Sequence, residues 1–243
     1  MRILLDDAPW ALVNWNVADV FREPRPLSER VSQALMGEAV RILEIAPNGW
    51  FHVRLERDGY LGWLRPGSLH PCSQDEALSY LAAADTLVVA ELAQTYAEPV
   101  VATLPTYQAT KVATTENGKL PFGVTLPATD QKGRFTALYL PDGRPWWVAE
   151  GDLLPVAQRP KPDAAGIAFT LDMIRRFVGI PYLWGGRSPF GYDCSGLAQT
   201  LMRQAWLTVL SGRNEVYEFA IGGRPGTIVA GSRDDLALEG EPP

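Results

Sequence analysis

Residues 179–196 read Gly-Ile-Pro-Tyr-Leu-Trp-Gly-Gly-Arg-Ser-Pro-Phe-Gly-Tyr-Asp-Cys-Ser-Gly, and this stretch decides how the C-terminal part of the chain folds. A loop rich in glycine and proline gives way at Asp193 to an amphipathic helix. Aspartate is a favoured N-cap residue because its carboxylate accepts hydrogen bonds from the free amide groups of the first helical turn. The sequence therefore predicts a helix that begins near Cys194, with a buried stripe formed by Leu197, Leu201 and Ala205.

Cys194 is the candidate nucleophile. In the first turn of a helix, free amide groups and the positive end of the helix dipole stabilise a thiolate. The same amide groups could bind the oxyanion that forms when a thiolate attacks a carbonyl carbon. The surrounding glycines would let a substrate approach the backbone closely. A lone cysteine at a helix start is, however, often an inert and buried small residue, so the local pattern by itself leaves both interpretations open.

The motif resembles the nucleophile motif of the NlpC/P60 cysteine peptidases. The resemblance rests on Pro-Tyr-Leu-Trp-Gly-Gly at 181–186 and on Asp-Cys-Ser-Gly-Leu at 193–197. It implies that Cys194 is the nucleophile, that Tyr182 lies beside it near the oxyanion, and that Asp193 and Ser195 bind the stem peptide and its free amine. The implied reaction is hydrolysis of the amide between γ-D-glutamate and a diamino acid in peptidoglycan stem peptides (muropeptides). The resemblance implies no metal and no other cofactor.

The resemblance does not extend to the catalytic base. In this family the base is a histidine on a strand downstream of the cysteine. The chain has two histidines, His52 and His70, and both precede Cys194. We therefore expect a truncated NlpC/P60 domain with impaired catalysis. A helix that lacks part of its sheet should leave apolar surface exposed around it, to be covered by a partner or in an oligomer.

A second helix is predicted just before the motif. Four apolar residues follow the helical spacing i, i+4, i+7, i+11, and Gly179 ends the pattern. These residues are Ile167, Leu171, Ile174 and Val178.

The first two thirds of the chain are predicted to be short strands separated by turns, as in small β-barrels. A weak internal repeat divides them into two copies: Phe21-Arg22-Glu23-Pro24 recurs as Tyr96-Ala97-Glu98-Pro99, and Trp63 corresponds to Trp147. Both copies resemble bacterial SH3 domains.

The expected fold class is mostly β with an α+β C-terminal part, in which two SH3-like β-barrels precede a truncated papain-like NlpC/P60 domain. We expect SH3-like domains over residues 1–72 and 85–156, a linking helix over 73–84, a linker over 157–163 and the partial peptidase domain over 164–243.

Composition excludes several other classes of protein. The net charge of −6 and the absence of a Lys/Arg block argue against a nucleic-acid partner. The two cysteines, Cys72 and Cys194, are too far apart in the sequence for a Cys-x-x-Cys metal site. No apolar run is long enough to span a membrane, and the N-terminus lacks the apolar core of a signal peptide. As written, the chain is expected in the cytoplasm, or in the cell envelope if an export signal has been removed.

Three hypotheses remain open from the sequence. The first is a peptidase whose sequence is cut short. The second is a non-catalytic protein that binds muropeptides through SH3-like domains and a dead peptidase cleft. The third is a peptidase whose base is supplied by a second chain.

Overall fold

The N-terminal part of the chain forms an eight-stranded antiparallel sheet, here called the N-terminal sheet. In the computed structural model, which describes residues 3–4, 9–99, 118–160, 164–204, 216–221 and 224–229, its strand order is β4-β3-β7-β6-β5-β2-β8, and β1 also pairs with β5. Alternate side chains of these strands form one apolar core, as the two-residue period of a strand requires. The strands are β1 (Ile3–Leu4), β2 (Trp10–Val13), β3 (Val17–Phe21), β4 (Arg30–Leu35), β5 (Ala39–Ile45), β6 (Phe51–Leu55), β7 (Leu61–Leu64) and β8 (Leu69–Cys72).

Helix α1 (Gln74–Ala83) follows directly. A capping box defines its start: the Ser73 hydroxyl accepts from the Glu76 amide at 3.2 Å, and the Glu76 carboxylate accepts from the Ser73 amide at 2.7 Å. The helix packs Ala77 against the N-terminal sheet, and its Tyr80 hydroxyl donates to the Tyr139 carbonyl oxygen at 2.7 Å. Helix α1 therefore contacts both β parts of the chain.

The second β part contains a five-stranded sheet and a three-stranded sheet, with strand orders β11-β10-β15-β14-β13 and β12-β9-β16. Leu35 and Met36 of the first part lie in the same apolar core as residues of these sheets, so the two β parts share buried surface. The strands are β9 (Thr86–Val88), β10 (Leu92–Tyr96), β11 (Lys119–Pro121), β12 (Thr125–Leu126), β13 (Ala128–Lys132), β14 (Phe135–Tyr139), β15 (Pro145–Ala149) and β16 (Leu153–Pro155), with short 3-10 turns η1 (Glu150–Asp152) and η2 (Val156–Gln158) on either side of β16.

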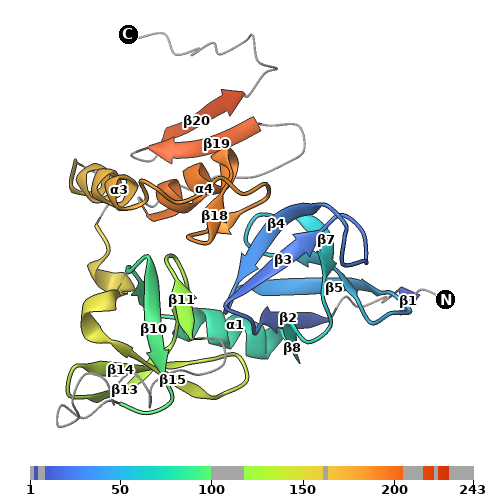
Figure 1. Ribbon diagram of the computed structural model, residues 1–243, viewed down its shortest axis with the longest axis horizontal. Coiled ribbons are helices and arrows are strands. Elements are labelled where there is room, and N and C mark those ends of the chain that lie inside the picture. Colours follow the sequence, from blue (N-terminus) through green and yellow to red (C-terminus); the bar gives the residue numbers. More distant parts are fainter. Residues whose placement is uncertain are drawn as a thin grey trace.

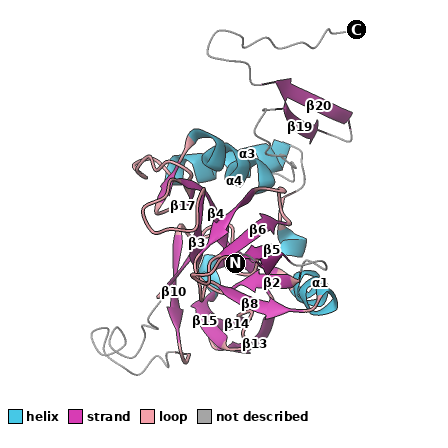
Figure 2. Cartoon of the chain, turned by 90° about the vertical axis from the view of Figure 1, so that its right-hand side faces the viewer, coloured by secondary structure: helices cyan, strands magenta, loops and turns pink. Residues whose placement is uncertain are grey.

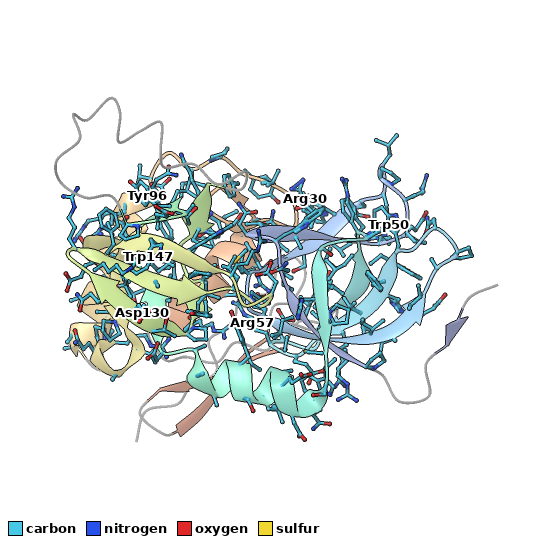
Figure 3. The ribbon with its side chains drawn as sticks, turned by 90° about the horizontal axis from the view of Figure 1, so that it is seen from below. Arg30, Trp50, Arg57, Tyr96, Asp130 and Trp147 are labelled. Atoms are coloured by element: carbon cyan, nitrogen blue, oxygen red, sulfur yellow. The ribbon has the colours of Figure 1, made fainter. Side chains whose placement is uncertain are left out.

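The internal repeat seen in the sequence has a structural counterpart. Phe21 pairs with Trp63 across β3 and β7, and Tyr96 pairs with Trp147 across β10 and β15. Figure 3 shows Tyr96 and Trp147 together in the second part. In each β part, the two residues that the repeat relates are therefore paired across neighbouring strands. The number of closed barrels stays a prediction.

The C-terminal part contains most of the helical residues that the structure describes. Helices α3 (Ala164–Arg176) and α4 (Cys194–Gln204) lie side by side, and the short strands β17 (Arg187–Ser188) and β18 (Gly191–Tyr192) form a hairpin between them in the sequence. Strands β19 (Val216–Ile221) and β20 (Arg224–Val229) form a second hairpin. In Figure 1 these two helices lie above the second β part. Among the described residues, no helix combines the length and apolar character that a bilayer crossing requires.

Helix α3 is present as predicted, but its four-residue apolar stripe faces outward. Ile167 and Val178, at the two ends of the stripe, are 62% and 82% exposed. The buried face is the neighbouring one, where Met173 packs with Phe122 of the second β part and with Phe177, the residue that follows the helix. On α4, Leu201 is buried and Leu197 is half-buried in the same core, whereas Ala205 lies outside the described residues. The exposed apolar surface therefore lies on α3, and a partner or oligomer that covers it stays a prediction.

Candidate functional site

The cysteine loop, residues 179–193, is held in shape by its own backbone. Leu183 donates its amide to the Tyr192 carbonyl oxygen at 2.9 Å, and Asp193 donates to Gly186 at 3.1 Å. Tyr182 forms an isolated parallel bridge with Tyr192. The backbone of the predicted site residue Tyr182 is therefore anchored to Tyr192, which lies two positions before Cys194, while the Tyr182 side chain is 66% exposed.

Asp193 is the N-cap of α4, as the sequence predicted. Its Oδ1 atom accepts from the Gly196 amide at 2.6 Å and from the Ser195 hydroxyl at 2.8 Å. Its Oδ2 atom accepts from the Gly185 amide at 3.0 Å. The structure thus brings the predicted pair Asp193 and Ser195 into direct contact and ties both to the loop, while their role in substrate binding stays a prediction.

Cys194 is exposed at the first position of α4. The Leu197 amide donates to the Asp193 carbonyl oxygen at 3.0 Å, which is the first i to i−4 hydrogen bond of the helix. The amides of Cys194 and Ser195 come before this bond, at the positive end of the helix dipole. A thiolate or an oxyanion at this position would be stabilised by the helix terminus.

The glycines around Cys194 allow other segments of the same chain to pack closely against them. A Cβ atom on Gly196 would collide with the carbonyl oxygen of Gly186, and one on Gly186 would collide with that of Gly191. Gly185 has a φ of +68°, and a Cβ atom there would lie 3.0 Å from the backbone of Arg30 and Val31 on β4. At these positions the space beside the glycine is filled by the loop, including Arg187, and by strand β4, while the approach of a substrate to their backbone stays a prediction.

The cysteine loop is docked on the N-terminal sheet through a buried polar network. Arg187, which is 2% exposed, donates to both carboxylate oxygens of Glu38 at 2.8 and 2.9 Å and to Asp58 at 3.3 Å. Its amide donates to Gln33 Oε1 at 2.8 Å. At the edge of the interface the Trp184 indole donates to Glu29 at 2.9 Å. Strand β17 accordingly lies beside β4 (Figure 2).

These N-terminal partners were missed by the sequence reasoning. Burial alone would raise the pKa of Glu38, but the charges of Arg187, Arg57 and Arg203 outweigh burial and lower that pKa to about 2. Arg57 Nη1 donates to Glu38 at 2.7 Å, and Figure 3 places Arg57 at the junction of the two β parts. The Glu38 carboxylate therefore forms ion pairs with several arginines.

A pocket of about 380 Å³ lies where the cysteine loop meets the N-terminal sheet. Its wall combines the apolar side chains of Leu183 and Phe190 from the loop with polar side chains from β3 and β4. Asp19 and Arg30 face each other there at 3.5 Å. The lining residues are Trp15, Asn16, Val17, Asp19, Arg30, Gln33, Arg65, Leu183 and Phe190.

The two histidines belong to the N-terminal sheet. His52 lies on β6 and stacks on Trp63, with ring centroids 4.8 Å apart, and His70 lies on β8. The second thiol, Cys72, is half-buried on β8, where burial and the charge of Glu76 raise its pKa. Within the described ranges, no group of three or more histidine, cysteine, aspartate or glutamate side chains is placed to hold a metal ion.

Two family models match the chain. Residues 20–69 match the bacterial dipeptidyl-peptidase SH3 domain, and residues 179–224 match the NlpC/P60 family. The chain is 28% identical over 193 residues to dipeptidyl-peptidase 6 of Lysinibacillus sphaericus, which covers 77% of this chain and 66% of that protein. It is 25% identical over 191 residues to a gamma-D-glutamyl-L-lysine dipeptidyl-peptidase of Bacillus cereus, which covers 73% of this chain and 51% of that protein. The chain thus spans between half and two thirds of the length of these two relatives.

Solved structures share the fold. A crystal structure of an NlpC/P60 family protein from Bacillus cereus superposes with a TM-score of 0.67 at 20% identity, covering 83% of this chain and 74% of that one. An NlpC/P60 endopeptidase from Photobacterium damselae subsp. piscicida gives a TM-score of 0.59 at 16% identity, covering 89% of this chain and 49% of that one. The predicted fold class is confirmed, and so is the resemblance to NlpC/P60 peptidases that carry an N-terminal SH3-like domain.

Proposed function

We propose that this chain, with its NlpC/P60 segment behind an SH3-like module, is a thiol peptidase that acts on muropeptides. The bond cleaved is the amide between γ-D-glutamate and a diamino acid, a substrate class suggested by the name of the Bacillus cereus relative, a gamma-D-glutamyl-L-lysine dipeptidyl-peptidase. The observation that carries the proposal is the exposed Cys194 at the capped N-terminus of α4. There the free amide groups of the first helical turn are placed to bind an oxyanion.

The proposed reaction proceeds in two steps. The Cys194 thiolate attacks the carbonyl carbon of the γ-glutamyl amide, and the negative oxygen of the tetrahedral intermediate is stabilised by amide groups in the first turn of α4. The C–N bond then breaks, the amine of the diamino acid leaves with a proton, and a thioester remains. Water hydrolyses this thioester and regenerates the thiol.

Proton delivery to the leaving amine limits the activity that we expect. The family places its base on a histidine downstream of the cysteine, whereas His52 and His70 lie in the N-terminal sheet. His52 is also engaged in stacking on Trp63. We therefore expect this 243-residue chain to turn over its substrate slowly, because the general acid must come from elsewhere or from solvent.

The pocket between the cysteine loop and the N-terminal sheet supports a peptide substrate with charged ends. Asp19 could bind a free amine, and Arg30 could bind a carboxylate, since each contributes the complementary charge to the pocket wall. Leu183 and Phe190 would pack on apolar parts of the peptide. Leu183 and Phe190 belong to the loop that leads to Cys194, so the pocket and the candidate nucleophile share one segment of the chain.

A second candidate function is muropeptide binding without turnover. It is favoured by the location of both histidines in the N-terminal sheet. In this case the pocket binds the peptide and Cys194 is dispensable.

The deciding experiment incubates the 243-residue chain with L-Ala-γ-D-Glu-L-Lys and with L-Ala-γ-D-Glu-meso-diaminopimelate and detects products by mass spectrometry. Cys194→Ala is compared with Cys72→Ala, which removes the other thiol. Loss of cleavage in Cys194→Ala alone supports the peptidase, and cleavage that persists in Cys194→Ala rules it out. If the unmodified chain cleaves neither peptide, titration calorimetry with the same peptides tests the binding function, which requires equal affinity in both variants.

A further inference from the structure

The cysteine loop has one charged side chain that is removed from solvent. The Arg187 side chain is 3% exposed, and its partners Glu38 and Asp58, in the turns that follow β4 and β6 of the N-terminal sheet, are 13% and 4% exposed. Nη2 of Arg187 contacts both Glu38 oxygens, and Nη1 contacts Asp58 Oδ2. A buried guanidinium bound in this way is costly to separate from its carboxylates, because an uncompensated buried charge would remain.

The backbone at the same position is held by a second contact. Gln33 Oε1 accepts from both the Arg187 amide, at 2.8 Å, and the Ser188 hydroxyl, at 2.9 Å. The Gln33 amide group in turn donates to Asp19 at 3.0 Å, which orients it. Ser188 is fully buried and Gln33 is 3% exposed. Side chain and main chain of β17 are thus both fixed to the N-terminal sheet.

Arg187 and its neighbours are connected to the residues around Cys194 by two direct backbone contacts. Strand β17 pairs with β18, where Arg187 lies opposite Tyr192, and Tyr192 is followed by the helix cap Asp193 and by Cys194. The backbone of Gly196 in the first turn of α4 packs directly on Gly186, the residue before Arg187. A displacement of β17 would therefore shift both the cap and the first turn.

We propose that Arg187 is a positioning residue, through which Glu38 and Gln33 of the N-terminal sheet hold the first turn of α4 in the geometry that activates the Cys194 thiol. The N-terminal sheet is then part of the reactive site, although it contributes no reacting atom. The catalytic importance of this coupling rests on the proposed peptidase function, but its effect on thiol reactivity does not.

The experiment measures the rate of Cys194 alkylation by iodoacetamide at neutral pH, followed by mass spectrometry, in a Cys72→Ser background. The variants are Arg187→Met, Arg187→Lys and Glu38→Gln. The matched control is Arg176→Met, which removes an arginine from an exposed ion pair with Asp172 on α3. Circular dichroism and urea unfolding establish that each variant is folded under the assay conditions.

We expect Arg187→Met and Glu38→Gln to slow alkylation at least fivefold, because a loosened first turn stabilises less thiolate. Arg187→Lys, which retains the charge, should recover part of the rate, and Arg176→Met should match the parent. Gln33→Met provides a milder variant that leaves no buried charge, and a severalfold loss is expected there too. The proposal would be overturned if every folded variant at Arg187, Glu38 and Gln33 were alkylated at the same rate as the parent. If Arg187→Met slows alkylation as expected but the parent chain cleaves no muropeptide, the result contradicts the peptidase function and leaves the positioning role intact.

Discussion

The carboxylate of Asp193 accepts a hydrogen bond from the amide of Gly196 at 2.6 Å, and this contact closes the first turn of α4. The same carboxylate accepts from the Gly185 amide at 3.0 Å, so one side chain both caps the helix and closes the loop before it. Because Cys194 lies between these contacts in the chain, the geometry of the candidate nucleophile depends on its neighbour.

Asp193→Ala should lower the free energy of unfolding of the C-terminal part by about 1–2 kcal/mol, because a helix cap is lost. Asp193→Asn retains an oxygen acceptor and should cost about half as much. Urea unfolding followed by circular dichroism measures both. Equal stability of Asp193→Ala and the parent would show that solvent replaces the cap.

Phe177 and Val178 are adjacent but lie in opposite environments. Phe177 is buried between Phe122 and Tyr192, at centroid distances of 5.0 and 5.5 Å, whereas Val178 is 82% exposed. Phe177→Ala should cost about 3–5 kcal/mol because it leaves a cavity in the core. Val178→Ala should change stability by no more than about 0.5 kcal/mol. A larger loss in Val178→Ala, measured by urea unfolding, would reveal that a second molecule covers the apolar surface at the C-terminal end of α3.

Stability should fall in acid through Glu38. Its pKa is about 2 in the folded chain, against an ordinary value of 4.5, so the unfolded chain binds the proton more tightly. The contribution of this group is therefore fully present above pH 4.5 and is lost as the pH falls toward 2. Urea unfolding at pH 6, 4.5 and 3 should show a smaller decline in Glu38→Gln than in the parent. Parallel declines in both proteins would place the acid sensitivity in other carboxylates.

Gly196→Ala tests the close approach of α4 to the cysteine loop. Alanine normally favours a helix over glycine by about 1 kcal/mol, yet here its Cβ atom would collide with the Gly186 carbonyl oxygen. We expect Gly196→Ala to destabilise the chain by about 1–3 kcal/mol, as overpacking does. Gly151→Ala is the control, because a Cβ atom there meets no atom within 4 Å. A thermal unfolding scan in which Gly196→Ala is the more stable variant would refute the packing.

Local signals made several features predictable. The helix that begins at Cys194 follows from Asp193 and from a periodic apolar stripe, both of which act within a few residues. The correspondence between Phe21 and Trp63 and between Tyr96 and Trp147 was also readable, because each aromatic pair lies across two neighbouring antiparallel strands. Helix α3 was predictable from the helical spacing of its apolar residues.

Which face of α3 is buried could not be predicted in this way. The helix has one apolar face that includes Ile167 and Leu171 and another that includes Phe169 and Met173, and periodicity does not rank them. The choice depends on Phe122, which is brought to α3 by the second β part. The glycines near Cys194 posed the same difficulty, because the atoms that fill the space around them come partly from β4.

By itself, the sequence determined the family resemblance, the capped helix start and the thiol at its first position, because these depend on residues that are near one another in the chain. Only the tertiary structure decided that Arg187 is buried and that the N-terminal sheet supports the cysteine loop. Arg187 and Glu38 are 149 positions apart, and either residue alone is typical of a solvated surface. Their charges become a buried pair only when the packing of β17 against β4 excludes water, and that packing is a property of the whole fold.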